Sequence, residues 1–280
     1  MRRSDLIAEA ARRLAAAGVE DARDDARRLL AHAGGLGQTA LITQMHETAP
    51  AEEAATFEAL IARRERREPL SQILGTVGFW TLDLKVTADV LTPRADTETI
   101  VEAALGAVPD RSAPVRVLDV ATGSGAIVLA LLSELPNASG VATDLSAAAL
   151  AVARENAAMN GLSGRVSFVE TSWADGVDGP FDLLVCNPPY IATGVIGTLE
   201  PEVRDHEPHL ALDGGADGLG PYPHLFEEAR RLLTPGGTAV FEIGYDQGEA
   251  ATTLARNAGW RAELMRDLAG RDRAVVITRR

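Results

Sequence analysis

From residue 115 to the end, short apolar runs alternate with stretches of helical spacing, and this alternation constrains the fold more than any other feature. The runs have strand length and are rich in Val, Ile, Leu and Phe. Strands that alternate with helices in this way predict an α/β domain with a parallel, doubly wound sheet. The seven predicted strands are 115–120, 139–143, 165–170, 181–186, 238–243, 261–265 and 274–278.

The preceding part of the chain has a different pattern. In residues 1–75, apolar side chains recur at helical spacing, which predicts a small N-terminal helical bundle suited to recognition. From Trp80 to Thr87 apolar and polar residues alternate, which predicts a strand within a β-hairpin linker at 76–92. The α/β domain is then predicted to span residues 93–280.

Four arginines cluster near the end of the predicted bundle: Arg63, Arg64, Arg66 and Arg67. One interpretation is a solvated helix end, where cations also suit the helix dipole. The other is a surface that docks a partner. The sequence leaves both interpretations open.

Charge and composition exclude several classes of protein. The 280 residues carry a formal net charge of −13, which argues against a protein that mainly grips nucleic-acid backbones. The single cysteine, Cys186, lies in an apolar strand, so no disulfide or cysteine metal site is expected. The five histidines also lack metal-site spacing, and no metal is predicted. No apolar run approaches the ~20 residues of a membrane span, so we expect a cytoplasmic protein without membrane attachment.

A glycine-containing turn follows the first predicted strand of the α/β domain. It consists of Ala121, Thr122, Gly123, Ser124 and Gly125. Glycines there let a ligand approach the backbone closely, although Val128 replaces the third glycine of a full dinucleotide fingerprint. Asp144 ends the second strand, where a carboxylate can bind both ribose hydroxyls. The pattern favours an adenosine-like ligand over a plain structural turn, and Trp173 is either a cover for the adenine or ordinary core.

The strand at 181–186 is followed by Asn187, Pro188, Pro189 and Tyr190. Proline cannot donate to a strand ladder, so the strand must end at Asn187. A residue before proline is held extended, so the backbone presents one amide and one aromatic ring at the strand's tip. Ligands bind at this edge of open α/β sheets. The alternative is a proline-rich turn with Tyr190 in the core.

Taken together, the glycine turn, the acid after the second strand and the Asn-Pro-Pro-Tyr segment resemble the S-adenosylmethionine-dependent amino methyltransferases. Further segments narrow the resemblance to the release factor glutamine methyltransferases; these are 92–98, 201–204, 207–208, 211–219 and 267–273. Two departures stand out. Ala95 replaces a usual proline, and Ala121 replaces a usual glycine.

The resemblance implies a Rossmann-like methyltransferase fold and a specific activity. Such enzymes methylate the side-chain amide of the glutamine in the Gly-Gly-Gln motif of peptide chain release factors, with no direct nucleic-acid partner. The bundle would recognise the release factor. The implied cofactor contacts are Ala121, Thr122, Gly123, Ser124, Gly125, Asp144, Trp173 and Asn187. The implied substrate site is Asn187, Pro188, Pro189 and Tyr190, with Asn187, Pro188 and Tyr190 catalytic.

A physical account agrees with this implication. An amide nitrogen is a poor nucleophile because its lone pair is delocalised, and no strong base is evident. Its two N–H groups could instead donate to the Asn187 side-chain oxygen and the Pro188 carbonyl while Tyr190 stacks on the amide plane. Catalysis would then rest on orientation and placed dipoles.

Two alternatives remain at the level of sequence. An adenine-N6 DNA or RNA methyltransferase also holds a planar nitrogen with a similar motif after base flipping. The acidic composition and the lack of a basic domain count against it. A non-catalytic adenosine-binding module would have no use for the intact Asn-Pro-Pro-Tyr segment.

Overall fold

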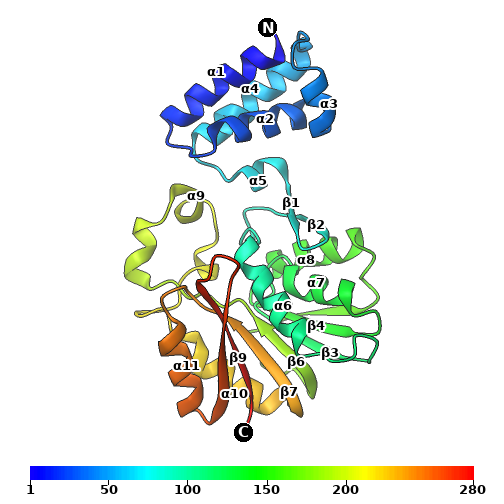
Figure 1. The fold of residues 1–280 in the computed structure, drawn as a ribbon, viewed down its shortest axis with the longest axis vertical. Coiled ribbons are helices and arrows are strands. Elements are labelled where there is room, and N and C mark those ends of the chain that lie inside the picture. Colours follow the sequence, from blue (N-terminus) through cyan, green and yellow to red (C-terminus); the bar gives the residue numbers. More distant parts are fainter. The chain divides into compact units, whose positions relative to one another are not determined.

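A computed structural model describes all 280 residues, which form two compact units (Figure 1). The first unit contains Met1–Gly75 together with Glu200–His206, and the second contains Thr76–Leu199 and Glu207–Arg280. The β-hairpin therefore belongs to the second unit rather than forming a separate linker. A segment from late in the chain, which we call the strap (Glu200–His206), belongs to the first unit, and the sequence did not indicate this.

The first unit is helical. Its elements are α1 (Arg3–Ala16), α2 (Ala22–Ala33), α3 (Gln38–Thr43), α4 (Ala51–Glu65), α5 (Leu70–Leu74) and the strap helix α9 (Pro201–Arg204). Helix α1 ends before Gly18, whose φ of +82° only glycine adopts without strain. Apolar stripes meet in a core that includes Leu14, Leu30 and Phe57. The short helix α5 was not predicted.

The arginine cluster is mostly used inside the first unit, so neither sequence interpretation describes it fully. Arg64 is buried and donates to Asp25 (Nε–Oδ2, 2.7 Å) and to Glu202 of the strap (Nη1–Oε1, 2.8 Å). Arg67 also donates to both oxygens of Glu202, at 2.6 Å each. Although burial alone would raise it, these hydrogen bonds lower the pKa of Glu202 to about 2. The two arginines therefore hold the strap in the first unit.

The remaining two arginines of the cluster differ from each other. Arg63 pairs with Glu68 at the end of α4. Arg66 is exposed at the C-cap of the same helix, and only this side chain stays available in the way the sequence suggested.

The second unit opens with a hairpin of β1 (Thr76–Phe79) and β2 (Leu82–Lys85). The strand predicted to begin at Trp80 was misplaced, because Trp80 lies in the tight turn with φ of +55°. Its backbone N–H donates to Glu98 (2.8 Å) and its indole N–H to Glu134 (2.8 Å). Phe79 and Leu84 carry the apolar face of the hairpin into the core.

A seven-stranded sheet forms the centre of the second unit, with order β5-β4-β3-β6-β7-β9-β8 (Figure 1). The strands are β3 (Arg116–Val120), β4 (Ser139–Asp144), β5 (Val166–Glu170), β6 (Phe181–Cys186), β7 (Leu233–Glu242), β8 (Trp260–Arg266) and β9 (Asp272–Arg279). Helices cover both faces, which confirms the doubly wound α/β prediction. One face carries α6 (Glu98–Gly106), α7 (Ala126–Glu134) and α8 (Ala147–Met159), and the other carries α10 (Pro221–Leu232) and α11 (Gly248–Asn257).

Two details of the predicted sheet were wrong. Strand β9 runs antiparallel to β7 and β8, because the connection between β8 and β9 is too short for a crossover. Strand β7 begins at Leu233, five residues before the strand predicted at 238–243, and its register with β6 shifts between Phe181 and Leu183.

Strand order reverses at β3, which pairs with β4 on one side and with β6 on the other. In such sheets the crevice for ligands opens at the carboxyl ends of the strands around this point. The glycine turn follows β3 and Asn187 follows β6, so the fold places both motifs at that crevice. None of the helices is long and apolar enough to cross a membrane.

Candidate active site

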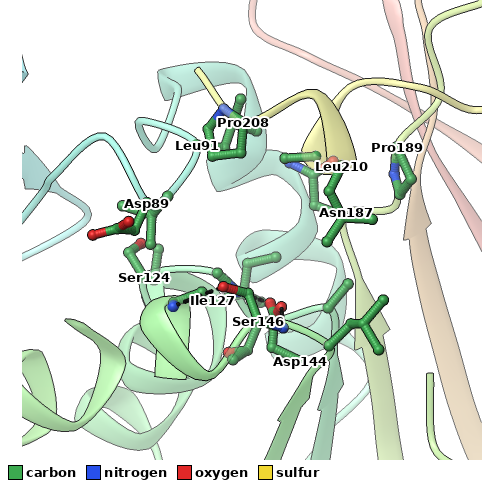
Figure 2. Close-up of a pocket in the computed structure, with 18 of the residues that line it drawn as sticks. Asp89, Leu91, Ser124, Ile127, Asp144, Ser146, Asn187, Pro189, Pro208 and Leu210 are labelled. Atoms are coloured by element: carbon green, nitrogen blue, oxygen red, sulfur yellow. Dashed lines mark hydrogen bonds between the residues drawn. The ribbon is translucent and has the colours of Figure 1, made fainter. Parts of the chain in front are cut away.

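A cavity of about 350 Å³ lies at this crevice, entirely within the second unit (Figure 2). It brings together all but three of the site residues predicted from sequence. The predicted residues that line it are Ala121, Thr122, Gly123, Ser124, Asp144, Trp173, Asn187 and Pro189. Gly125, Pro188 and Tyr190 do not line it.

The glycine turn has a left-handed backbone. Both Ala121 and Gly123 have positive φ, of +56° and +54°. Residues with a Cβ are strained in this conformation by about 1–2 kcal/mol. This explains physically why glycine suits position 121 and identifies Ala121 as a strained residue at the cavity wall.

Asp144 is pre-oriented at one end of the cavity, where Figure 2 shows it beside Ser146. Its Oδ2 accepts from the Gly123 N–H (2.8 Å) and its Oδ1 from the Ser146 N–H (2.9 Å). Each carboxylate oxygen has a second lone pair. Asp144 can therefore bind a diol without moving.

Trp173 forms part of the wall with a strained backbone, φ of +51°. The hydroxyl of Thr143 donates to the Trp173 carbonyl (2.5 Å), and the Thr143 carbonyl accepts from the Thr122 N–H (2.9 Å). Thr143 thus ties the glycine turn to Trp173. The ring also lies 5.8 Å from that of His224 and packs against the core of the second unit. Because Trp173 lies both on the cavity wall and against the core, its role as an adenine cover stays a prediction.

The segment after β6 divides between the cavity and the core. Asn187 and Pro189 face the cavity, as Figure 2 shows, whereas Pro188 is buried. Tyr190 is half-buried, and its hydroxyl donates to Glu242 Oε1 at 3.1 Å. The Asn187 Nδ2 donates to the Thr97 hydroxyl at 3.4 Å.

Gly125 has a packing role instead of a cavity position. It precedes α7 with φ of +83°. A Cβ there would lie 3.2 Å from Leu129 and 3.3 Å from Ala153. The glycine therefore allows α7 to start close to α8.

Sequence reasoning missed two walls of the cavity. One contains Asp89, Val90, Leu91, Pro93, Arg94 and Thr97, and the other contains Pro208, Leu210 and Ala211. Both fall in or beside segments that carried the family resemblance without an assigned role. Figure 2 shows Leu91 and Pro208 together, across the cavity from Asp144.

Glu207 joins these two walls. Its side chain is nearly fully buried, and each of its oxygens accepts from Arg94 Nη2 at 2.8 Å. It also accepts from the Thr92 N–H at 3.3 Å. Burial raises the pKa of Glu207 despite the opposing charge of Arg94.

Two glycines of segment 211–219, which carried part of the family resemblance, lie against the backbone of Pro189 and Tyr190. A Cβ at Gly214 would lie 2.7 Å from the Pro189 carbonyl, and one at Gly218 would lie 2.2 Å from the Tyr190 carbonyl. The Gln247 side chain donates to that same Tyr190 carbonyl (2.9 Å). The chain around 214–218 can therefore approach Tyr190 closely only because these residues are glycine.

Two buried carboxylates lie beneath the cavity edge. Burial raises the pKa of Asp119, at the end of β3, to about 7, although Thr122 and Val128 donate to it. Burial likewise raises the pKa of Glu242, at the end of β7, to about 7, against the stabilising effect of Thr97, Tyr190 and Arg273. Such shifts cluster at functional sites.

One cluster of potential metal ligands exists, formed by Asp175, His224 and Glu228. It lies outside the cavity lining, and Arg231 already pairs with Glu228. It has no place in the site described above. His206 and His209 do not take part in this cluster.

Comparisons with known proteins agree with this geometry. A family profile described as "PrmC N-terminal domain" matches residues 5–75, and one described as "Methyltransferase small domain" matches residues 102–202. A solved ribosomal protein L11 methylase from Lactobacillus delbrueckii subsp. bulgaricus shares the fold, with a TM-score of 0.51 and 24% identity over 70% of this chain and 85% of that one.

Full-length relatives give the family. The release factor glutamine methyltransferase of Caulobacter vibrioides is 48% identical over 94% of this chain and 92% of its own length. That of Deinococcus radiodurans is 44% identical over 100% of this chain and 99% of its own length. With this similarity over its whole length, and with the glycine turn, Asp144 and Asn187 on one cavity, the chain belongs to the release factor glutamine methyltransferase family.

Proposed function

We infer that this protein transfers a methyl group from S-adenosylmethionine to the side-chain amide nitrogen of the glutamine in the Gly-Gly-Gln motif of peptide chain release factors. The observation that carries this inference is an amide side chain, Asn187, on the wall of the same cavity as Asp144 and the glycine turn. Family membership supplies the substrate class.

The residues present fit the cofactor. The Asp144 carboxylate has free lone pairs for the ribose hydroxyls, and the Gly123 backbone is open because no Cβ stands there. Apolar residues of the wall, such as Leu145 and Ile127, suit an adenine, and Trp173 would cover it. When bound, S-adenosylmethionine supplies an electrophilic methyl group on a sulfonium cation, which the acidic groups at the cavity tolerate.

The chain's own residues would orient the nucleophile. Asn187 and the Pro188 carbonyl would accept the two N–H groups of the substrate amide and so aim its nitrogen at the methyl group. Tyr190 would flank the amide plane, held by Glu242 at its hydroxyl and by Gln247 at its carbonyl. Neither group acts as a base, because the proton becomes acidic only once the nitrogen is alkylated.

We also propose that the helical bundle of the first unit recognises the release factor. All the cavity residues belong to the second unit, so the bundle is free for another task. Contacts remote from the reacting atoms can supply orientation that a short peptide lacks. The intact factor should therefore be a better substrate than a Gly-Gly-Gln peptide.

An adenine-N6 methyltransferase is the runner-up, because such enzymes use a motif similar to the Asn-Pro-Pro-Tyr segment. The net charge of −13 opposes binding of a nucleic-acid backbone. The full-length relatives are also named for release factors.

Mass spectrometry of a release factor after incubation with enzyme and cofactor tests the function. One methyl group should appear on the glutamine of the Gly-Gly-Gln peptide, and a factor with that glutamine replaced should stay unmodified. The variant Asn187→Ala should transfer about 10²- to 10³-fold more slowly, the effect of removing one placed dipole. A methyl group found on adenine of DNA or tRNA, with none on the factor, would favour the runner-up.

A further inference from the structure

Arg94 is the only basic side chain that lines the cavity of the second unit. The other charged side chains of the lining are the carboxylates of Asp89 and Asp144. Both acids repel an anionic group of a ligand, so Arg94 is the one charged side chain of the wall that attracts such a group. Its side chain is 48% exposed and is therefore open to a ligand.

The buried carboxylate of Glu207 fixes Arg94 at this position. The Glu207 side chain is 1% exposed, and both of its oxygens accept from a single nitrogen of Arg94, Nη2, at 2.8 Å each. The same carboxylate accepts from the Thr92 N–H at 3.3 Å, so it also holds the backbone two residues before Arg94. A side chain that is already held loses less freedom when a ligand binds to it.

The pair with Glu207 uses only part of the Arg94 guanidinium. An arginine has five N–H donors, and since two of them are on Nη2, the other three are on Nε and Nη1. Arg3 in the first unit shows a different arrangement, because it donates to Glu53 through both Nε and Nη2, at 2.7 Å each, and both side chains are buried. An arginine that served only to neutralise a buried acid would be expected in that arrangement, whereas Arg94 keeps about half of its surface exposed at the cavity.

The cofactor brings an anionic group to this cavity. S-adenosylmethionine ends in an amino acid whose carboxylate is ionised at neutral pH, and its adenine and its amino acid extend from different carbons of the ribose. With the ribose at Asp144 and the adenine beside Trp173, the amino acid is left with the rest of the cavity. Figure 2 shows Leu91 and Pro208, which neighbour Arg94 and Glu207 in the chain, across the cavity from Asp144.

We propose that Arg94 binds the carboxylate of the methionine part of S-adenosylmethionine, and that Glu207 is a positioning residue that holds Arg94 for this contact. The inference rests on the cofactor of the proposed function and adds a residue to its binding. The cofactor carboxylate would accept from Nη1 or Nε, which Glu207 does not use. A ligand with the same adenosine but without a carboxylate gains nothing from Arg94.

The central test compares the affinities of two ligands for the full-length enzyme. S-adenosylhomocysteine carries the carboxylate, whereas 5′-methylthioadenosine has the same adenosine and sulfur without the amino acid. Arg94→Gln should weaken binding of S-adenosylhomocysteine about 10- to 100-fold, as expected for the loss of a charged hydrogen bond. Its affinity for 5′-methylthioadenosine should change less than about twofold, since the adenosine contacts are intact. Isothermal titration calorimetry measures the first ligand directly and the second by competition with it.

The positioning role of Glu207 has its own readout. Glu207→Gln removes the charge that holds Nη2, and the affinity for S-adenosylhomocysteine should fall about three- to tenfold, with that for 5′-methylthioadenosine unchanged. The double variant Arg94→Gln/Glu207→Gln should bind S-adenosylhomocysteine no more weakly than Arg94→Gln, because Glu207 acts on this ligand only through Arg94. A purely structural Glu207 would instead weaken both ligands by the same factor.

Two further variants serve as controls. Arg111→Gln removes an arginine of similar exposure, 52%, which pairs with Glu134 at 3.2 Å and does not line the cavity. This variant should bind both ligands as the wild type does. Asp144→Ala should weaken both ligands, because both contain the ribose.

The proposal is overturned if Arg94→Gln binds S-adenosylhomocysteine as tightly as Arg111→Gln, or if it weakens both ligands by the same factor. An unchanged affinity together with a lower kcat/KM for the release factor would assign Arg94 to the substrate instead. Should either single variant fail to fold, the double variant, which removes both charges together, gives the same comparison of ligands. A wild-type enzyme that binds S-adenosylhomocysteine but leaves the release factor unmodified would refute the proposed function and leave this inference standing.

Discussion

Two buried carboxylates of the first unit and two of the second are held in different ways. In the first unit, buried Glu53 accepts from buried Arg3 through two hydrogen bonds of 2.7 Å, and Asp25 accepts from Arg64 at 2.7 Å. In the second unit, Asp119 and Glu242 are buried at 0% and 1% exposure and accept hydrogen bonds from neutral groups.

This difference separates architecture from chemistry. A bidentate arginine–carboxylate pair satisfies both carboxylate oxygens and fixes where two helices meet, as Arg3 and Glu53 join α1 to α4. A carboxylate that keeps an unpartnered oxygen, as both Asp119 and Glu242 do, is costly to bury, and such groups cluster at functional sites.

The largest effect should follow from removing one partner of a buried arginine–carboxylate pair. Glu53→Ala leaves the Arg3 guanidinium buried without its bidentate partner, and the free energy of unfolding should fall by about 3–5 kcal/mol. Urea denaturation monitored by circular dichroism measures this. The double variant Arg3→Met/Glu53→Leu should recover most of the loss, and a single variant as stable as wild type would remove the contrast.

A smaller effect should appear in the pH dependence of stability, through the buried carboxylate of Glu242. The pKa of Glu242 is raised from its usual 4.5 to about 7, so the folded state binds a proton that the unfolded state releases between these values. The contribution of Glu242 to stability is therefore fully present below about pH 4 and is lost as pH rises through 7, by about 3 kcal/mol.

The measurement is the difference in unfolding free energy between wild type and Glu242→Gln across that pH range. Tyr222→Phe, which keeps the Glu242 carboxylate, should show the same change of unfolding free energy with pH as the wild type. If the unfolding free energy of Glu242→Gln changes with pH as much as that of the wild type, Glu242 does not titrate as described.

The next effect concerns cofactor affinity. Asp144→Ala should weaken binding of S-adenosylmethionine by about 1.5–3 kcal/mol, since a charged hydrogen-bond acceptor is lost. Isothermal titration calorimetry gives the value. Asp89→Ala removes an exposed carboxylate from the same cavity and should have a much smaller effect; similar losses in both variants would count against a specific ribose contact.

The smallest effect should come from the exposed arginine of the first unit. Arg66→Glu should lower kcat/KM for the intact release factor only about two- to fivefold, and more so at low salt, because a rim charge acts mainly on association. Its melting temperature should stay unchanged. Arg67→Glu, which loses the pair with Glu202, should instead lower the melting temperature. An Arg66→Glu enzyme with wild-type kinetics at every salt concentration would exclude Arg66 from the docking surface.

The sequence by itself determined the doubly wound α/β fold, the glycine turn after β3 and the proline-terminated strand before Asn187. These features depend on local rules: apolar periodicity sets strands and helices, and proline cannot continue a ladder. The carboxyl ends of parallel strands share one edge, so the sequence also placed Asp144 and Asn187 near each other without any structure.

Only the tertiary structure decided which distant residues meet. Nothing local links Glu202 to Arg64, Glu207 to Arg94, or Glu242 to Tyr190, because each pair is joined across different elements by the packing of the whole unit. The antiparallel direction of β9 and the turn at Trp80 depended on connection geometry that apolar spacing does not encode. The strap was likewise hidden, since a four-residue helix becomes part of the first unit through tertiary contacts such as the ion pair of Glu202 with Arg67 and the hydrogen bond from Gln72 to the His206 carbonyl.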